Sequence, residues 1–234
     1  MKNNRNFLFY GVGSVAFGIK GNAFSWFLFF YYNMVIGLPA WMASLALAIA
    51  TIWDAISDLI IGYSSDHTKS RLGRRHPYMY AALIPVPIFF VLLWSPPTFD
   101  TDFNLFLYLL IMAILVRTFT TLFEIPNQSL GPEITREYHE RTKMMSLRYF
   151  FGWMGGTIMT ILMYFVFLKP TAEYPNGQLN PEGYQINGIV AAIIMLVAMN
   201  ISSRGINHLI PNLSKPAANN NFSEKILPCF HKSS

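Results

Sequence analysis

The chain has 234 residues, of which 53% are hydrophobic and only 12% are charged. An ordinary soluble domain contains about 25% charged residues, so this composition excludes a typical water-soluble fold; it also excludes a disordered chain, which needs low hydrophobicity. The single cysteine, Cys229, excludes a disulfide framework and a multi-cysteine zinc site.

Long stretches without Asp, Glu, Lys or Arg predict membrane-spanning helices, since a helix needs about 20 mainly apolar residues to cross the hydrocarbon core. The stretch between Lys20 and Asp54 is too long for one helix, and Gly37-Leu38-Pro39 is expected to divide it. We predict six spans, near residues 9–35, 40–63, 78–95, 104–127, 144–168 and 186–203. The predicted fold class is therefore an all-α membrane protein.

Basic residues cluster in alternate connections between these spans. Most of the 17 basic residues lie in the N-terminus, the second-to-third loop, the fourth-to-fifth loop and the tail, whereas the opposite connections hold Lys169 and several acidic residues. The positive-inside rule then predicts a multi-pass protein of the cell inner (plasma) membrane with both termini in the cytoplasm. We interpret the net charge of +5 as a sign of topology and expect no nucleic-acid partner.

Charged residues also occur within the predicted spans. They are Lys20, Arg117 and Arg148, and Asp54, Asp58 and Glu124. A charge at the bilayer centre costs about 2.5–3.5 kcal/mol on insertion scales, so such groups persist when they pair, face water or bind a ligand. One hypothesis is a set of mutual ion pairs that fixes helix packing. The preferred hypothesis is a functional site, since intramembrane ionisable residues mark substrate and ion pathways.

Helical spacing places the two aspartates on one face of the second span. Thr51, Asp54, Asp58 and Gly62 follow the pattern i, i+3, i+7 and i+11, with Ser57 beside them. Two carboxylates one turn apart repel each other unless a cation or a proton lies between them. Aspartate, serine and threonine supply the oxygen ligands that sodium prefers, so this face predicts a site for a coupling cation.

The fourth and fifth spans contribute a second polar set. The fourth span has one polar face, formed by Arg117, Thr121, Glu124 and Gln128. On the fifth span, Arg148 has a fork of donors that suits a carboxylate or vicinal hydroxyls. The pair Gly152 and Gly156 instead predicts close helix packing, because it forms a Gly-x-x-x-Gly motif.

The connection after the second span contains a dense motif. Its residues are Gly62, Asp66, Arg71, Gly73, Arg74 and Arg75. We expect Gly62 to let the helix end approach its neighbour and Asp66 to cap a helix or pair with the arginines. The basic run is expected to hold the loop in the cytoplasm. This pattern resembles the loop signature of the major facilitator superfamily.

The wider stretch WDAISDLIIGYSSDHTKSRLGRRHPY (53–78) resembles the glycoside–pentoside–hexuronide:cation symporters, the melibiose permease-like family of that superfamily. EIPNQSLGPEIT (124–135) and SLRYFFGWMGG (146–156) are similar to the fourth and fifth helices of that family, and the resemblance extends over about residues 8–226. It implies a secondary active transporter that takes up a sugar with sodium or a proton. It implies no enzymatic activity and no cofactor apart from that cation.

The resemblance also implies roles for individual residues. The implied cation-binding residues are Asp54, Ser57, Asp58 and Thr121, and the implied substrate-binding residues are Glu124, Arg148, Gln128 and Lys20. Ser57 stands where melibiose permease has an asparagine, Glu124 where it has an aspartate, and Gln128 where the sugar site has a tryptophan. An acidic sugar ligand of the first helix is missing near Gly18, and the neighbouring Lys20 changes the charge there. These departures point to a sugar other than melibiose.

Members of that family have twelve helices in two six-helix halves, and this chain resembles the N-terminal half. We expect residues 1–205 to form a six-helix bundle and residues 206–234 to be the start of the central cytoplasmic loop with a truncated tail. Since transporter sites of this kind lie between the halves, we expect that the 234-residue chain alone performs no alternating access and that a C-terminal half is missing.

Two alternatives stay open. The first is that the chain is a non-transporting remnant or a half-transporter subunit. The second and more remote one is a metal-dependent membrane phosphotransferase that uses Asp54, Asp58 and Asp66. The usual motif spacing of such phosphotransferases is absent from this sequence.

Overall fold

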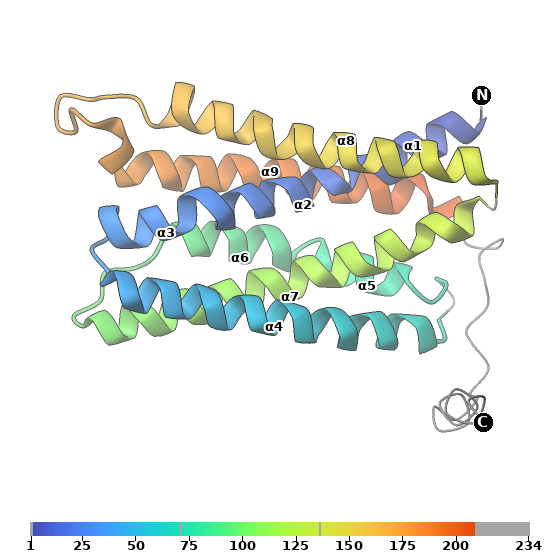
Figure 1. Cartoon of the computed structure of the whole chain (residues 1–234), viewed down its shortest axis with the longest axis horizontal. Helices are drawn as coiled ribbons and strands as arrows, with labels where there is room; N and C mark the ends of the chain where they lie inside the picture. Colours follow the sequence, from blue (N-terminus) through green and yellow to red (C-terminus); the bar gives the residue numbers. More distant parts are fainter. Residues whose placement is uncertain (1, 71, 136, 209–234) are drawn as a thin grey trace, which may run out of the picture.

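The computed structural model describes residues 2–70, 72–135 and 137–208, and in it long helices run side by side along one axis (Figure 1). The α-helices are α1 (Lys2–Val12), α2 (Ser14–Asn22), α3 (Leu28–Phe30), α4 (Ala40–His67), α5 (His76–Ala82), α6 (Pro85–Trp94), α7 (Asp102–Ile134), α8 (Tyr138–Leu162) and α9 (Pro181–Gly205). Shorter helical turns are the π-helical Ala23–Phe27, Tyr31–Val35 and Met163–Phe167 and the 3₁₀ turn Gly177–Leu179.

Five helices of the described chain are long and apolar enough to cross a membrane. They are Ala40–His67, His76–Trp94, Asp102–Ile134, Tyr138–Phe167 and Pro181–Gly205, which confirms the second to sixth predicted spans. Several of them extend beyond a predicted end: α4 continues past residue 63 to His67, and α7 continues past residue 127 to Ile134. The reason is that hydropathy marks only the apolar part of a helix, while backbone hydrogen bonding continues into the polar region.

The first predicted span, 9–35, differs from the expectation of one continuous helix. The helical segment begins at Lys2 but is interrupted: a turn at Gly13 separates α1 from α2, the π-helical Ala23–Phe27 separates α2 from α3, and a second π-helical turn, Tyr31–Val35, follows α3. No single helix in this segment reaches the length of the other five. A π-helical turn forms i→i+5 hydrogen bonds and takes up an extra residue, which an apolar run does not reveal. The predicted break after it is confirmed, because Gly37 has a φ of 95° and α4 begins directly after Pro39.

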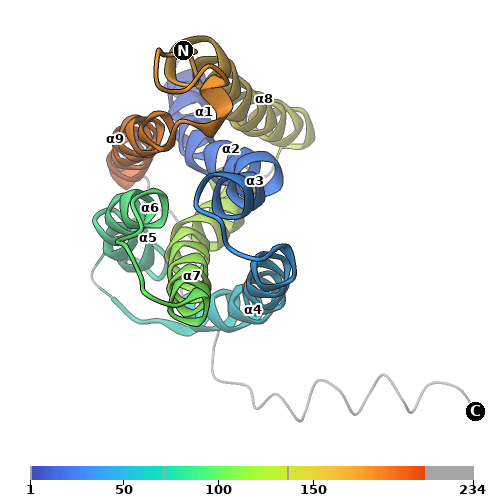
Figure 2. The same ribbon diagram turned by 90° about the vertical axis from the view of Figure 1, so that its left-hand side faces the viewer.

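The helices pack in a reciprocal pattern. In Figure 2, α1, α2 and α3 lie with α8 and α9, while α4, α5, α6 and α7 form the other group. The segment α1–α3 packs on α8 and α9, α7 packs on α4, α5 and α6, and α6 meets α9. Exchanging the first segment with α7, α4 with α8, and α5–α6 with α9 reproduces these same contacts. The bundle therefore consists of two three-helix repeats with equivalent contacts, one from α1 to α6 and the other from α7 to α9.

Small residues bring α2 and α8 into direct backbone contact. A Cβ atom at Gly18 would overlap the carbonyl oxygen of Gly152, and one at Gly156 would lie 2.7 Å from the carbonyl oxygen of Gly18. A Cβ at Gly155 would lie 3.0 Å from the Cα of Val15. The predicted packing role is therefore confirmed for Gly156, whereas a Cβ atom at Gly152 would lie 3.5 Å from the carbonyl oxygen of Ser14, an ordinary van der Waals contact. We call this contact the glycine seam.

Tyrosine hydroxyls satisfy the last carbonyl groups of α6. Tyr31 donates to the carbonyl of Trp94 at 3.0 Å, Tyr32 donates to that of Leu93 at 2.8 Å, and Tyr108 donates to that of Leu92 at 2.7 Å. The final carbonyls of a helix have no partner within the helix, so these bonds complete the end of α6 and tie it to its neighbours.

We expect Tyr32→Phe to lower the free energy of unfolding by about 1 kcal/mol, because Tyr32 is fully buried and its loss leaves the Leu93 carbonyl without a donor. The measurement is thermal or denaturant unfolding in detergent micelles. Tyr108→Phe is the matched control, since its hydroxyl bond is exposed and water can replace it. An equal effect of both substitutions would contradict the role of burial.

The connections fall at two ends of the bundle. The end of α4, the start of α5, the end of α7 and the start of α8 lie at the same end of the bundle as the start of α1 and the end of α9, while the links before α4, α7 and α9 lie at the other end (Figure 1). The basic connections of the described chain thus share one end, as the predicted topology requires. The orientation of that end toward the cytoplasm stays a prediction, and residues 209–234 of the predicted tail lie outside the described residues.

Candidate functional site

The six charged residues of the predicted spans converge at the middle of the bundle. They come from four elements: Lys20 from α2, Asp54 and Asp58 from α4, Arg117 and Glu124 from α7, and Arg148 from α8. All are buried or half-buried. Helical spacing predicts which of them share a face, and the structure shows which faces meet.

Asp54 lies at the centre of this group. Its Oδ2 accepts a hydrogen bond from Arg117 Nη1 at 2.5 Å, and its Oδ1 accepts one from the Thr121 hydroxyl at 3.3 Å. Arg117 Nη2 also donates to the hydroxyl of Thr51 at 3.2 Å, so Thr51 and Asp54 do face α7 together. The hydroxyl of Ser57 donates to the main-chain carbonyl of Asp54 at 3.0 Å, which is a bond within α4.

Lys20 joins Asp54 to the second carboxylate. Its Nζ is 3.9 Å from Asp54 Oδ2 and 3.7 Å from Glu124 Oε2, and Arg148 Nη2 lies 3.6 Å from Glu124 Oε1. The result is a chain of alternating charges from Arg117 to Arg148. We call Arg117, Asp54, Lys20, Glu124 and Arg148 the ion-pair chain. Within the described residues, Asp58 has no ion pair.

Aromatic rings help to hold the cations of this chain in place. The guanidinium of Arg117 lies 4.6 Å from the ring centre of Phe24, and the ammonium of Lys20 lies 5.6 Å from that of Phe17. A buried cation gains from the negative face of a ring as well as from carboxylates. Unpaired buried charges are strongly destabilising, so these charges must be paired whether they serve helix packing or a functional site. The ion pairs therefore agree with both hypotheses.

A cavity of about 300 Å³ adjoins one end of the ion-pair chain. It is lined by Ser14, Phe17, Gly18, Gly21, Asn22, Glu124, Gln128, Arg148, Tyr149, Gly152 and Trp153. Three of the four predicted substrate-binding residues, Glu124, Gln128 and Arg148, therefore share one cavity, and Lys20 lies beside its lining. Carboxylate, amide and guanidinium groups next to aromatic rings can bind the hydroxyls and the apolar faces of a sugar.

Three aromatic residues of this cavity, Phe17, Tyr149 and Trp153, are absent from the residues predicted for the site. Tyr149 and Trp153 follow Arg148 on α8, and their side chains are 62% and 75% exposed. Tyr149 and Trp153 are four residues apart, so they share one face of α8, and this aromatic pair directly after Arg148 is the signal that the sequence offered.

The loop motif forms a second charged cluster. Asp66 accepts a hydrogen bond from Arg75 Nη2 at 2.7 Å, as expected for an aspartate that pairs with the arginines. Arg75 Nη1 is 2.7 Å from Glu133 Oε1, and Arg74 also pairs with Glu133, a residue of α7 that the motif does not include. Gly73 has a φ of 79°, a conformation that favours glycine. Arg71 lies outside the described residues.

The expected role of Gly62 was wrong. A Cβ atom at this position would lie 3.6 Å from Cγ2 of Ile125, which is an ordinary van der Waals contact. The approach of α4 to α7 at this point therefore does not require glycine. Gly18, near the position of the missing acidic ligand, does permit a close approach, because its packing against Gly152 leaves no room there for any side chain.

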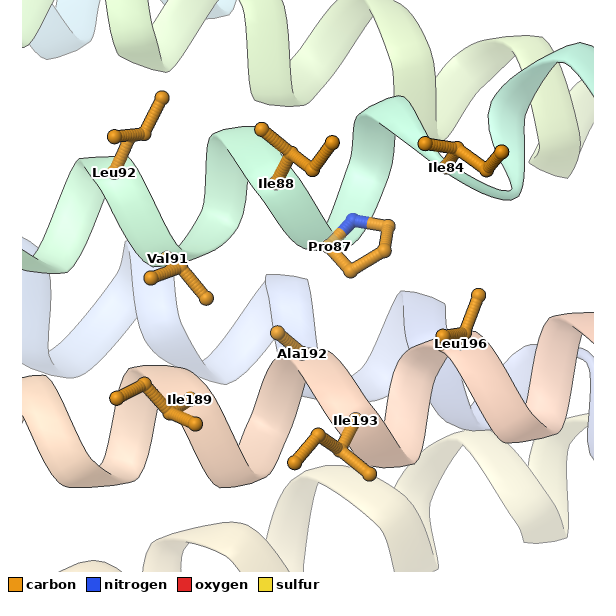
Figure 3. A pocket seen from close by; sticks show the side chains of 9 residues that line it. All are labelled: Ile84, Pro87, Ile88, Val91, Leu92, Ile189, Ala192, Ile193 and Leu196. Atoms are coloured by element: carbon orange, nitrogen blue, oxygen red, sulfur yellow. The ribbon is translucent and has the colours of Figure 1, made fainter.

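A different cavity, of about 460 Å³, lies between α6 and α9. Figure 3 shows its side chains, which are Ile84, Pro87, Ile88, Val91, Leu92, Ile189, Ala192, Ile193 and Leu196. All of them are apolar, so this cavity offers no side-chain hydrogen bond to a sugar.

The described residues contain no group of three or more His, Cys, Asp or Glu side chains that could hold a metal ion. The phosphotransferase alternative needs Asp54, Asp58 and Asp66 to act together, and this finding gives it no support. Asp66 instead lies in the loop cluster with Arg75.

The sequence is similar to a known family of transport proteins and to several individual symporters. The family model described as "MFS/sugar transport protein" matches residues 9–227. An uncharacterized symporter of Synechocystis sp. is 32% identical over 217 residues, which are 90% of this chain and 40% of that protein. The isoprimeverose transporter of Lactiplantibacillus pentosus is 26% identical over 80% of this chain and 38% of its own length.

The sodium-dependent lysophosphatidylcholine symporter 1 of Mus musculus is also similar. It is 29% identical over 67% of this chain and 30% of its own length. The chain thus spans about 40% or less of the length of these three relatives.

Proposed function

This chain belongs to the MFS/sugar transport protein family, and from that premise we propose that it forms the N-terminal half of a sugar:cation symporter of the glycoside–pentoside–hexuronide type. The observation that supports this proposal best is the cavity in which Glu124, Gln128 and Arg148 lie together with Tyr149 and Trp153. The named substrate of one relative, the isoprimeverose transporter, belongs to the same chemical class.

In the proposed mechanism, Glu124 accepts hydrogen bonds from sugar hydroxyls and Arg148 donates to them. Trp153 stacks on an apolar sugar face. Gln128 can both donate and accept, so it suits the mixed hydroxyl pattern of a sugar. Glu124 and Arg148 are 3.6 Å apart, close enough that one sugar can contact both.

The proposed cation site comprises Asp54, Ser57, Asp58 and Thr121, with sodium or a proton as the coupling cation. It adjoins the sugar cavity through Lys20, which is within ion-pair distance of both Asp54 and Glu124. Cation and sugar would then raise each other's affinity by the same factor, because coupling between two binding sites is reciprocal. One relative is named as sodium-dependent, which supports cation coupling at the level of the family.

Alternating access needs a second six-helix half, because sites of this kind lie between two halves. We propose that such a half acts as the partner of this bundle in the membrane and that no catalytic reaction takes place at the site. Without that partner, the bundle is a binding half-site that moves no substrate. Purified chain in liposomes should therefore show no sodium- or proton-driven sugar uptake, and measurable uptake would contradict this requirement.

Sugar binding to the purified chain in lipid nanodiscs is the direct test. Tryptophan fluorescence is titrated with methyl glucosides, methyl galactosides, methyl xylosides and glucuronides, and Trp153→Phe identifies the reporting residue. We expect at least one sugar to saturate the signal and Arg148→Ala to weaken its binding at least about tenfold, equivalent to about 1.4 kcal/mol. Arg204→Ala is the control, because Arg204 is exposed at the end of α9, away from the cavity.

The result that would overturn the sugar proposal is a complete lack of saturation by all four sugar classes in a folded sample. If lysophosphatidylcholine saturates the signal instead, and Arg148→Ala weakens that binding, the cavity belongs to the other substrate class found among the relatives.

A further inference from the structure

The side chain of Lys20 occupies the space between the two proposed half-sites. It extends from α2 with only 8% of its surface exposed, and its ammonium lies 3.9 Å from Asp54 Oδ2 and 3.7 Å from Glu124 Oε2. One carboxylate belongs to the proposed cation site and the other to the proposed sugar site. A positive charge is thus already present at the point where a bound cation would link them.

Asp54 has no free oxygen for a metal ion in this arrangement. Its Oδ1 accepts the hydroxyl of Thr121 at 3.3 Å, and its Oδ2 faces both Arg117 at 2.5 Å and Lys20. A sodium ion at Asp54 would therefore lie within a few ångströms of two fixed positive charges, in a region where water screens them poorly. It would also have to replace the hydrogen bonds that these donors make.

The charges that face this space from every surrounding helix balance one another. They are Lys20 on α2, Asp54 and Asp58 on α4, Arg117 and Glu124 on α7, and Arg148 on α8, so the positive and negative charges are equal in number. A sodium site normally keeps an excess of negative charge to offset the bound ion. Here the sequence itself provides the compensating cation.

We propose that the Lys20 ammonium is a tethered counter-ion that takes the place of sodium between Asp54 and Glu124, so that ligand binding at the cavity does not depend on sodium. This inference rests on the proposed function and refines its coupling step. Lys20 acts as a positioning residue that transmits the state of Asp54 to Glu124.

The test measures sodium itself and therefore does not depend on the identity of the sugar. Thermal unfolding of the purified chain in nanodiscs is followed in sodium chloride and in choline chloride at equal ionic strength. We expect the wild-type midpoint to be the same in both salts. Lys20→Gln is expected to gain a sodium-specific rise, with sodium binding at least about tenfold tighter than in the wild type. The double variant Lys20→Gln/Asp54→Asn should lose that rise.

Lys69→Gln is the matched control, because it removes an exposed lysine from the loop after α4 and should leave the salt response unchanged. A sodium-specific rise in the wild type that disappears in Asp54→Asn would overturn the proposal, and this arm does not need Lys20→Gln to fold. A folded Lys20→Gln variant that gains no sodium response would also overturn it. If sugar binding fails while the sodium results are as expected, only the proposed function is contradicted.

Discussion

Replacing Gly18 by alanine is expected to lower the free energy of unfolding by about 3 kcal/mol or more, the upper range for overpacking a core. The added methyl group would overlap the main-chain carbonyl oxygen of Gly152, and the next atoms along that path are also backbone. A flexible side chain could rotate away, but a backbone carbonyl moves only if α2 and α8 separate. Such a separation would open the glycine seam and the cavity that lies next to it.

Gly21→Ala is the matched control for this prediction. Gly21 lies on the same helix about one turn later, and a Cβ atom there meets nothing within 4 Å. Alanine is favoured over glycine inside a helix, so this variant should be unchanged or more stable by up to about 1 kcal/mol. Unfolding in dodecylmaltoside, induced by heat or by sodium dodecyl sulfate, measures both. Equal stability of the two variants would show that the seam is not as tight as described.

Replacing Glu133 by glutamine is expected to have the second large effect, a loss of about 3 kcal/mol in stability. Glu133 is 10% exposed and pairs with both Arg74 and Arg75, whose side chains are 13% and 7% exposed. Removing the charge of one partner from a buried ion pair typically costs about 3–5 kcal/mol, because it leaves the other charge without compensation. Here two guanidinium groups lose their buried carboxylate.

Asp66→Asn provides the comparison within the same cluster. Its side chain is 45% exposed, so water already solvates much of the carboxylate, and exposed ion pairs contribute about 1 kcal/mol or less. Chemical or thermal unfolding of both variants should therefore show a clear difference, with Glu133→Gln the less stable. If Asp66→Asn were the more damaging substitution, burial would not be the source of the stability of this cluster.

Much of the helical layout follows from the sequence, because the bilayer imposes a minimum apolar length that charge-free runs reveal directly. The break at Gly37 was predictable as well, since glycine and proline change the backbone in known ways. The π-helical turns at Ala23–Phe27 and Tyr31–Val35 were not predictable, because they depend on hydrogen bonds and packing that a uniformly apolar segment leaves undetermined.

In the candidate site too, some features were predictable from the sequence and others were not. Helical spacing correctly grouped Thr51 with Asp54 and placed Glu124 and Gln128 on one face, since this grouping is a property of a single helix. The partners across helices needed the structure. Nothing in the spacing indicated that Lys20 would reach both Asp54 and Glu124, or that Glu133 would complete the loop motif. Such contacts depend on how helices that are distant in sequence are placed side by side.

The ion-pair chain has a consequence for the synthesis of the protein. The intramembrane charges emerge from the ribosome in the order Lys20, Asp54, Asp58, Arg117, Glu124 and Arg148. Their running sum alternates between a single unit charge and neutrality, because the second, fourth and fifth spans each bring a charge opposite to one that is already in the membrane. Since each isolated charge costs about 2.5–3.5 kcal/mol at the bilayer centre, this order limits the cost borne at any moment of co-translational insertion. The first two spans can leave the translocon together as a hairpin, with Lys20 already paired to Asp54.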